Sequence, residues 1–596
     1  TDINIVGSEL TAANLLNLSA GRDINLLAGT GSSLDRSETT RERVGIEVTT
    51  DSNGINAFAG REVHTVNDEL DNQTLQASIL QAGNRVQLAA DNNLKQVSSD
   101  VAAGNDVIYQ AGNDIMLDAA LAYETSTHSE TTRRDGISVS LSHNYETTRQ
   151  AVKNAGEGDN DVSRTSSTLQ AIDSVNNFLS GPTASGFAGT SITYQRAMES
   201  TGVARSSTLQ AGGDIQLVAS NDIDIRGSQL FAGNDMQLAA ENVRILSVDN
   251  RFQQAGESRF ERAGFVANAG KNSASIGVGA NFNEQLSDYD AAGAQISYLH
   301  AGNNLAINAN TDILVGSSDL DATNDISLTA GRDVMLIAQA FDSNYDEQGK
   351  SWGAEVGVAA TVSEGGPALG VYGSAQLGDN ELRRDGTSYR NSHLTAGNNL
   401  AIKSGRDTRV TGATGDADNL SMDVGRDLTV ASVQDIEQAD GRRRDVSGRV
   451  VGGAGASVSL SVGYGETEGD KDWVTEQTRL VGRNSVDIRV EEHTQLDGAL
   501  IANIDENGVD QGNLRLDTGT LAFNDIKDRH QETSYYLNVG ITTSDEKGNN
   551  PNQQEGNRQT GMATLSGQKA NGDGSTGFTI SGYHSETDRS QINRAT

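Results

Sequence analysis

The chain repeats one short phrase, in which a small residue and a glycine precede Asn or Arg, then Asp or Asn, then alternating apolar and polar residues. The phrase runs from Ala20 to Leu26 as AGRDINL and from Ala111 to Leu117 as AGNDIML. Strict alternation predicts a short β-strand, and a Gly-Asn or Gly-Arg-Asp step suits a tight corner. The copies at Gly83 and Gly104 start 21 residues apart. Such a fixed period indicates a chain built from stacked repeats.

About 20 residues with two or three short strands predict an all-β fold, a right-handed parallel β-helix (solenoid). In this fold the inward Ile, Leu and Val of one coil stack on those of the next coil, about 4.8 Å away. A single coil cannot bury its apolar face alone, so stability comes from its neighbours. A β-sandwich also has short strands at intervals of about 8–12 residues. Its strands occupy unlike environments, so identical phrases at a fixed period favour the solenoid.

The coils come in blocks that alternate with longer excursions, and we expect one continuous body over residues 1–596. The coil blocks lie near 1–30, 81–119, 211–246, 301–338, 396–433 and 482–526. The excursions lie near 31–80, 120–210, 247–300, 339–395, 434–481 and 527–590. The repeating unit is therefore roughly 90 residues long.

The excursions have a β pattern of their own. Gly136–Glu146 and Gly455–Glu466 are two of several excursion stretches that alternate apolar residues with Ser, Gly, Asn or Thr over about nine residues. We predict long amphipathic strands that pair as antiparallel hairpins projecting from the coils. The residues that would face a membrane or a partner are Ile137, Val139, Leu141, Tyr145, Val458, Leu460, Val462 and Tyr464.

One excursion also carries a helical period. Its apolar residues are Leu169, Ile172, Val175, Phe178 and Leu179, followed by the Gly181-Pro182 stop. This spacing predicts one short helix packed against the coils.

Composition excludes several classes of function. The chain has 45 basic and 81 acidic side chains, a formal net charge of −36, which argues against a nucleic-acid partner because phosphate binding needs clustered Lys and Arg. The absence of Cys removes disulfides, thiolate nucleophiles and Cys-ligated metals. No stretch approaches 18 consecutive apolar residues. The start at Thr1 has neither Met nor a signal-peptide pattern, so we expect a segment of a longer chain.

No catalytic, cofactor or metal site emerges from the motifs. The eight histidines are scattered without metal-ligand spacing, and no G-x-S-x-G elbow or phosphate-binding loop is present. The Gly-Asn-Asp phrases lack the nine-residue register of calcium-binding β-rolls, so structural corners are favoured over calcium sites. Asp505–Asp510 lacks the length and the final Glu of an EF-hand loop. We therefore expect a protein that is not an enzyme, with no cofactor.

The repeated phrase at roughly 20-residue spacing resembles the haemagglutinin repeat of filamentous-haemagglutinin-type exoproteins. The Ser-Glu-Thr-Thr interruptions at Ser37 and Ser129 lead into alternating strands. They are similar to the second repeat region of contact-dependent growth inhibition effectors of the CdiA type. The resemblance covers essentially the whole chain.

The resemblance implies export by two-partner secretion and a filament on the outside of the Gram-negative outer membrane. The partners it implies are the cognate outer-membrane transporter, the target cell's outer membrane or a surface receptor, and the flanking β-helix and C-terminal toxin of the same chain. In the growth-inhibition branch this region is thought to help the toxin across the target outer membrane. No activity of the secretion domain, the receptor-binding tip or the toxin is assigned to this segment.

Two functions remain open on the residues alone. In the first, the segment is a filament and translocation module whose hairpins rearrange on contact and engage a membrane. In the second, it is an adhesin stalk, decorated by soluble hairpins, that attaches to host or neighbour surfaces. A third possibility, a carbohydrate-active β-helix enzyme, would require a unique carboxylate cluster, whereas the acids here recur in corners along the chain.

Overall fold

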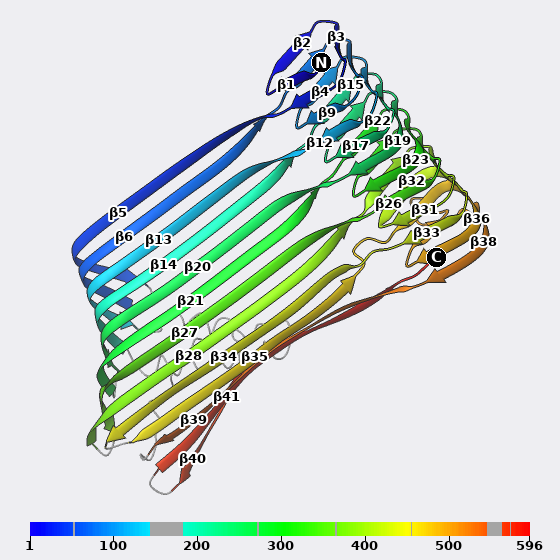
Figure 1. Ribbon diagram of the computed structural model, residues 1–596. Coiled ribbons are helices and arrows are strands. Elements are labelled where there is room, and N and C mark those ends of the chain that lie inside the picture. The colour runs from blue at the N-terminus through cyan, green and yellow to red at the C-terminus, as the bar shows by residue number, and fades with distance from the viewer. Residues whose placement is uncertain are drawn as a thin grey trace.

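The computed structural model describes residues 1–51, 54–142, 183–270, 273–363, 366–453, 456–544, 563–571 and 574–596. These residues form two bodies of β-structure, a core of short parallel strands and one broad sheet of long antiparallel strands (Figure 1). The prediction of an all-β chain with a parallel core and antiparallel hairpins is confirmed. The described ranges contain no helix, and the helix predicted at Leu169–Leu179 lies outside them.

The parallel core consists of three ladders, in which each strand pairs with the equivalent strand one repeat earlier and one repeat later. The first ladder contains β1 (Ile3–Val6), β4 (Ile24–Leu27), β9 (Leu94–Val97), β12 (Ile115–Asp118), β17 (Asp222–Arg226), β26 (Asp333–Ile337), β31 (Thr408–Thr411) and β33 (Asp427–Ala431). The second contains β2 (Glu9–Ala12), β7 (Ile79–Ala82), β10 (Asp100–Ala103), β15 (Thr208–Ala211), β18 (Gln229–Ala232), β22 (Tyr298–Ala301), β24 (Asp319–Ala322), β29 (Ser392–Ala396) and β37 (Leu500–Ala502). The third contains β3 (Leu15–Ala20), β8 (Arg85–Ala90), β11 (Val107–Ala111), β16 (Ile215–Ala219), β25 (Ile326–Ala330) and β30 (Asn399–Ser404).

Longer strands continue around a corner, so that one strand pairs with neighbours in more than one ladder. They are β19 (Met236–Leu246), β23 (Leu305–Gly316), β32 (Ala413–Val424), β36 (Arg479–Asp497) and β38 (Leu514–Asn524). We call three successive strands, one from each ladder, a rung. Neighbouring rungs are in register with an offset of 21 residues in the first ladder, where Ile3 pairs with Ile24. The sequence period is thus the rung length.

The core lies between the three ladders. Ile24, Ile115 and Leu217 have no solvent exposure, as the repeated phrase requires. Apolar residues stack rung on rung, as where Val107 pairs with Ile215 on the next rung. Each such side chain contributes about 1.5–3 kcal/mol when fully buried.

The second body is a sheet of 13 antiparallel strands. Its strands are β5 (Gly29–Asp51), β6 (Gly54–Gln76), β13 (Ala120–Ser142), β14 (Thr183–Arg205), β20 (Val248–Ala269), β21 (Ser273–Gln295), β27 (Gln339–Ser363), β28 (Gly366–Arg390), β34 (Asp435–Gly453), β35 (Ser457–Trp473), β39 (Ile526–Ser544), β40 (Ala563–Asn571) and β41 (Gly574–Asn593). They form six successive hairpins, numbered 1 to 6 along the chain, with β39, β40 and β41 in hairpin 6. Each hairpin pairs laterally with the next, so the strands run side by side in chain order from β5 to β39, with β41 next to β39 and β40 at the edge (Figure 1).

The hairpins leave the core at one corner, between the first and second ladders, and only at every second rung. On the alternate rungs the same corner is a tight turn with a left-handed residue. These turn residues are Gly7, Ser98, Gly227, Ser317, Gly412 and Gly498, with φ between +43° and +69°. The chain therefore alternates strictly between a tight turn and a long hairpin at this corner.

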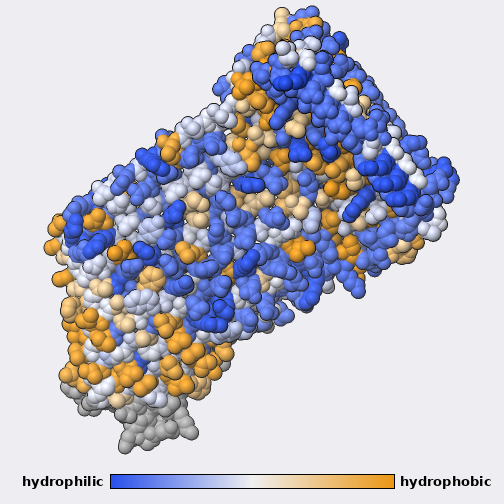
Figure 2. Space-filling view, viewed as in Figure 1, coloured by the Kyte–Doolittle hydropathy of each residue, from blue (hydrophilic) through white to orange (hydrophobic). Residues whose placement is uncertain are grey.

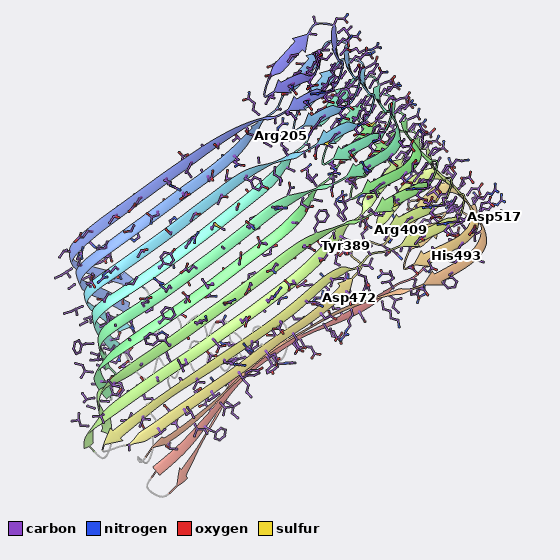
Figure 3. The ribbon with its side chains drawn as sticks, viewed as in Figure 1. Arg205, Tyr389, Arg409, Asp472, His493 and Asp517 are labelled. Carbon is purple, nitrogen blue, oxygen red and sulfur yellow. The ribbon has the colours of Figure 1, made fainter. Side chains whose placement is uncertain are left out.

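A hydroxyl fastens the base of each of the first five hairpins. Ser78 follows hairpin 1, and its Oγ donates at 2.7 Å to the carbonyl of Leu27, the last residue of β4 before that hairpin. The same bond recurs from Ser207 to Asp118, from Ser297 to Leu246, from Ser392 to Ile337 and from Thr478 to Ala431. The two ends of five hairpins are thus tied directly together. Arg205, labelled in Figure 3, adds a bond of 2.6 Å to the Ser98 carbonyl at the base of β14.

Two rungs and one hairpin advance by the same distance. Strands are about 4.7–4.9 Å apart in the hydrogen-bonding direction of any sheet, parallel or antiparallel. Two rungs therefore move along the core by about 9.6 Å, and the two strands of a hairpin fill the same width. This match lets all six hairpins pair without fanning apart.

The hairpin strands are much longer than the alternating stretch of about nine residues that predicted them. β13 has 23 residues, of which the predicted strand near Ile137 is only the far end. The half nearer the core is rich in Ser, Thr and charged residues, as in Ser126–Arg134. Lateral pairing on both sides, and not an apolar stripe, holds this half in the sheet.

We predict that deletion of one rung, residues 84–104, separates hairpin 1 from hairpin 2. The core rejoins because Gly83 replaces the equivalent Gly104, but the hairpin bases then lie one strand width apart, where two are needed. Amide hydrogen exchange should show loss of protection between β6 and β13 by at least about tenfold, with protection at Leu217 retained. Full protection of β6 and β13 would contradict the spacing argument.

Candidate functional site

The hairpin sheet has two faces of different chemistry. Residues paired across strands share a face, so the register assigns every side chain. We call the side of Ile137 face A and the side of its neighbour Gly136 face B.

The far ends of the hairpins carry an exposed apolar band on face A. Side-chain exposure reaches 81% at Ile46 and 69% at Leu369. The band consists of Val44, Ile46, Val48, Ile137, Val139, Leu141, Phe265, Ile276, Val278, Val356, Val358, Leu369, Val371, Val446, Val450, Val458, Leu460, Val462, Leu537, Val539, Ile541 and Phe578. Figure 2 shows hydrophobic residues gathered at the end of the sheet farthest from the parallel core. Contiguous exposed apolar surface of this kind marks an interaction site.

The band is continuous because the register places its members in rows. One row starts at Ile137 and ends at Val458, two residues predicted from different excursions. It runs Ile137, Ala188, Phe265, Val278, Val356, Gly373, Val450, Val458. Each member is the direct cross-strand partner of the next, so the sheet brings separate excursions into one surface.

The predicted membrane-facing residues of two strands lie in this surface. Val139 and Leu141 on β13 are exposed, as are Leu460, Val462 and Tyr464 on β35. Tyr145 lies outside the described residues.

Aromatic residues border the apolar band on its inner side. Trp352 stacks on Phe282 with ring centroids 6.3 Å apart, and Tyr464 lies 6.3 Å from Tyr535. All four side chains point to face A. They separate the apolar band from the charged half of the sheet.

Face B of the same ends carries hydroxyls and amides together with aromatic rings and arginines. The hydroxyls and amides include Ser138, Ser140, Asn281, Ser459 and Ser461, and Arg262 lies over the ring of Phe187. Ser461 donates to the Asn538 side chain on the next strand at 2.6 Å. The far strands therefore alternate apolar and hydroxyl residues.

Nearer the core, face A is charged and paired. In the repeated Arg-Arg-Asp-Gly motif, Arg133 holds Asp135 at 2.9 Å, and this hydrogen bond lowers the pKa of Asp135. Arg383 holds Asp385 in the same way at 2.8 Å. The motif therefore builds equivalent ion pairs on two hairpins, on strands that run in opposite directions.

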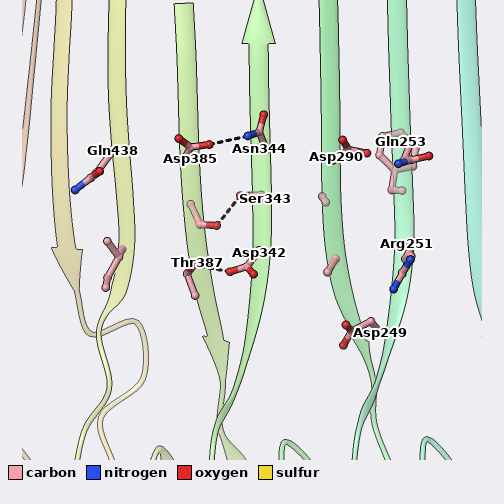
Figure 4. A pocket seen from close by; sticks show the side chains of 15 residues that line it. Asp249, Arg251, Gln253, Asp290, Asp342, Ser343, Asn344, Asp385, Thr387 and Gln438 are labelled. Atoms are coloured by element: carbon pink, nitrogen blue, oxygen red, sulfur yellow. Dashed lines mark hydrogen bonds between the residues drawn. The ribbon is translucent and has the colours of Figure 1, made fainter.

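An open hollow at the base of the sheet gathers four carboxylates, of Asp249, Asp290, Asp342 and Asp385 (Figure 4). Asn344 donates to Asp385 and Thr387 donates to Asp342, each at 2.7 Å. The residues that line the hollow include no histidine, cysteine or lysine that could act as base or nucleophile. Within the described ranges no group of three or more His, Asp or Glu could hold a metal ion. In the same ranges, no helix is both long and apolar enough to cross a membrane.

The acids of the Gly-Asn-Asp corners bind the neighbouring rung. Asp235 Oδ1 accepts from the Asn303 side chain at 2.8 Å and from the Asn304 amide at 3.1 Å. Gly-Arg-Asp corners use an ion pair instead, as between Arg406 and Asp333. These bonds account for the corner acids, which sequence analysis assigned to structure.

A small charged cluster joins β29 to the segment after hairpin 5. His393 Nδ1 lies 2.9 Å from Asp319, and its Nε2 lies 3.1 Å from Glu476. The hydrogen bonds to Asp319 and then to Glu476 raise the pKa of His393 to about 9. The imidazole is therefore a cation at neutral pH.

Comparison with known protein families assigns the chain to one of them. The family model described as Hemagglutinin repeat matches residues 1–69, 59–181, 188–295 and 283–448. The chain belongs to the Hemagglutinin repeat family. It is the haemagglutinin-repeat region of a CdiA contact-dependent growth inhibition exoprotein, as the resemblance implied.

Similar proteins are all far longer than this haemagglutinin-repeat chain. It is 39% identical over 280 residues to Toxin CdiA of Yersinia pestis, covering 45% of the chain and 8% of the relative. It is 27% identical over 607 residues to tRNA nuclease CdiA of Escherichia coli strain STEC_O31, covering 96% of the chain and 18% of the relative. Deoxyribonuclease CdiA of Dickeya dadantii is 27% identical, over 91% of the chain and 16% of the relative. No solved structure matches.

Sequence reasoning missed most of the apolar band. Val44 and Ile46 lie between Arg and Glu residues in β5, and Leu369 and Val371 are interrupted by glycine. The alternation itself is the signal that could have found them, since every second residue there is apolar.

We predict that the His393 cluster stabilises the haemagglutinin-repeat chain most below pH 6.5. The pKa is raised in the folded state, so the contribution is complete below the unfolded value of about 6.5 and is lost as pH rises through about 9. The Tm difference between wild type and His393→Gln should shrink over this interval. A constant difference from pH 6 to 10 would show that protonation contributes nothing.

Proposed function

We propose that this segment is a non-enzymatic surface filament and translocation module of a contact-dependent toxin-delivery exoprotein, and that its apolar band engages the target cell's outer membrane. The exposed apolar band on face A is the observation that carries the proposal. Family membership supports it, because CdiA exoproteins are secreted and surface-exposed.

The dimensions of the band fit a bilayer. From Val356 to Ser363, β27 continues for eight residues, or about 26 Å at a strand rise of about 3.3 Å per residue. The apolar belt of outer-membrane strands is about 25 Å tall. At the tilt of about 35–45° that is usual for such strands, the far ends of the hairpins span most of this belt, while the charged halves stay outside it.

The chemistry of the two faces supports the same assignment. Strands in outer membranes alternate apolar residues toward lipid with polar residues on the other side, and carry aromatic girdles at the interface. Here Val458, Leu460 and Val462 alternate with Ser459 and Ser461. The Trp352 and Tyr464 contacts lie where the apolar band ends, at the position of such a girdle.

We propose that the parallel core is a right-handed β-helix and that residues 1–596 form one continuous body with it. In this arrangement the core forms the filament, and the hairpin sheet projects from it toward the membrane. The proposed partners are the cognate two-partner-secretion transporter, the target outer membrane or a surface receptor, and the flanking β-helix and C-terminal toxin of the same exoprotein. The net charge of −36 supports a function without nucleic acid.

Vesicle leakage tests the proposal. The purified 596-residue chain should release a trapped dye from vesicles of phosphatidylethanolamine and phosphatidylglycerol. The double variant Val458→Asp, Leu460→Asp should release it at least about tenfold more slowly, since a charged side chain costs about 2.5–3.5 kcal/mol in the hydrocarbon layer.

The matched control places the same two charges on face B of the same strand. Ser459→Asp with Ser461→Asp should retain most of the leakage, because these positions do not face lipid. Equal leakage by wild type and the Val458, Leu460 variant would refute the membrane assignment and favour the adhesin stalk.

A further inference from the structure

Four of the five junctions between neighbouring hairpins place two glycines directly opposite each other. The pairs are Gly60–Gly136, Gly189–Gly264, Gly277–Gly357 and Gly370–Gly453. They occur at β6/β13, β14/β20, β21/β27 and β28/β34, which are the first four junctions of the sheet. The first two pairs share one row, and the later pairs lie progressively nearer the hairpin tips. We call this oblique series the glycine line.

Only glycine fits at these positions. A Cβ added to Gly60 would lie less than 3.0 Å from the Asp135 carbonyl oxygen and 2.7 Å from the Gly136 Cα. A Cβ on Gly189 would lie 2.7 Å from the Gly264 Cα. The clashing atoms are backbone, so no side-chain rotation relieves them. Gly293 in β21 of the same sheet has nothing within 4 Å.

Close approach of backbones on one face indicates that the sheet bends there. Glycines in register are a known device for kinking a sheet, because they allow curvature that a Cβ would block. Figure 1 shows the far ends of β5, β6, β13 and β14 turning behind the sheet. Because these glycines point to face B, face B is the inner side of the bend and the apolar band lies on its outer side.

Aromatic rings cover glycines of the line on face B, and an arginine lies over each ring. A ring atom of Phe58 is 3.0 Å from the Cβ position of Gly60, and Phe187 covers Gly189 at the same distance. The arginine-to-ring distances are 5.4 Å for Arg134 over Phe58, 5.6 Å for Arg262 over Phe187, 4.5 Å for Arg449 over Tyr372 and 4.9 Å for Arg443 over Tyr536. Tyr372 lies against Gly277, and Tyr536 lies against Gly463 and Gly465 at the next junction.

The arginines depend on the rings for much of their contact. Within the described residues, the Nε atoms of Arg262 and Arg449 are buried without a hydrogen-bond partner. A guanidinium over an aromatic face is attracted by its quadrupole, and more strongly where water is excluded. Arg134 and Arg443 also pair with Glu62 at 2.6 Å and Asp445 at 2.8 Å, so at Arg262 and Arg449 the ring is the more important contact that clamps the inner side of the bend.

We infer that the glycine line is a hinge that sets the angle of the apolar band against the charged half of the sheet, and that the arginine–aromatic pairs hold the bent form. The line follows the inner border of the band at β6, β13, β14 and β20 and crosses the band at β27 and β28, so turning about it moves the apolar residues beyond the line and leaves the paired charges in place. That the motion serves lipid contact rests on the proposed function, whereas the hinge itself does not.

Spin labels on one strand measure the bend. The chain has no Cys, so Gln253→Cys and Ala267→Cys place two labels on exposed positions of β20, on either side of Gly264. A straight strand of this length spans about 46 Å at about 3.3 Å per residue. Pulsed electron resonance on the free chain should give a shorter, narrow distribution, and vesicles of phosphatidylethanolamine and phosphatidylglycerol should shift it toward the straight value.

Loss of the clamp should free the hinge without any membrane. The triple variant Arg134→Gln, Arg262→Gln, Arg449→Gln should broaden the distribution in solution, while the corresponding Lys variants broaden it less because they keep the charge. If the triple variant broadens the distance but wild type causes no leakage, the hinge stands and the membrane function fails. If wild type causes leakage while the label distance never changes, the hinge is refuted and the membrane function stands.

A second variant tests the glycines themselves. Gly189→Ala should reduce amide protection beyond the line in β14 and β20 by at least about tenfold and leave the parallel core protected. Gly293→Ala is the matched control and should leave both unchanged. Equal protection in the two variants would show that the glycine line is not needed for the bend.

Discussion

The spacing of hydrogen-bonded strands is the constraint on which this molecule depends. Parallel and antiparallel strands are separated by nearly the same distance, about 4.7–4.9 Å. The core advances two rungs for every hairpin. Each hairpin therefore leaves the core directly beside the last strand of the previous hairpin. The strict alternation of a tight turn and a hairpin at one corner follows from this match. With any other ratio the hairpins would separate or overlap, and the surface on face A would be divided.

Two kinds of residue maintain the alternation of tight turn and hairpin at the corner between the first and second ladders. Left-handed residues such as Gly7 and Ser98 close the corner on one rung, and hydroxyls such as Ser78 and Ser207 tie the hairpin base on the next. At another corner, Asn and Asp side chains form hydrogen bonds from rung to rung. The corner carboxylates therefore serve as acceptors within the core. The hairpin sheet is then free to combine a charged half, an apolar band and the glycine line that lies between them over much of the sheet.

The repeated phrase predicted the parallel core because its period is the rung and its alternation is the strand. It also predicted Ile137 and Val458 as outward residues of amphipathic strands, and they lie in one row. The length of the hairpin strands could not be predicted, because their core-proximal halves consist largely of Ser, Thr and charged residues and carry no apolar alternation. The register between neighbouring hairpins could not be predicted from the sequence either. Gly60 and Gly136 are 76 residues apart, and nothing local to either shows that they face each other.

Cysteine crosslinking across one junction tests the central claim, that successive hairpins lie side by side in a register set by the core. Gln195 on β14 is the direct partner of Ser258 on β20, whereas Gln254 is displaced by four residues, or about 13 Å. Oxidation should join cysteines placed at Gln195 and Ser258 and should not join those at Gln195 and Gln254. Equal crosslinking of both pairs, or of neither, would contradict a single registered sheet.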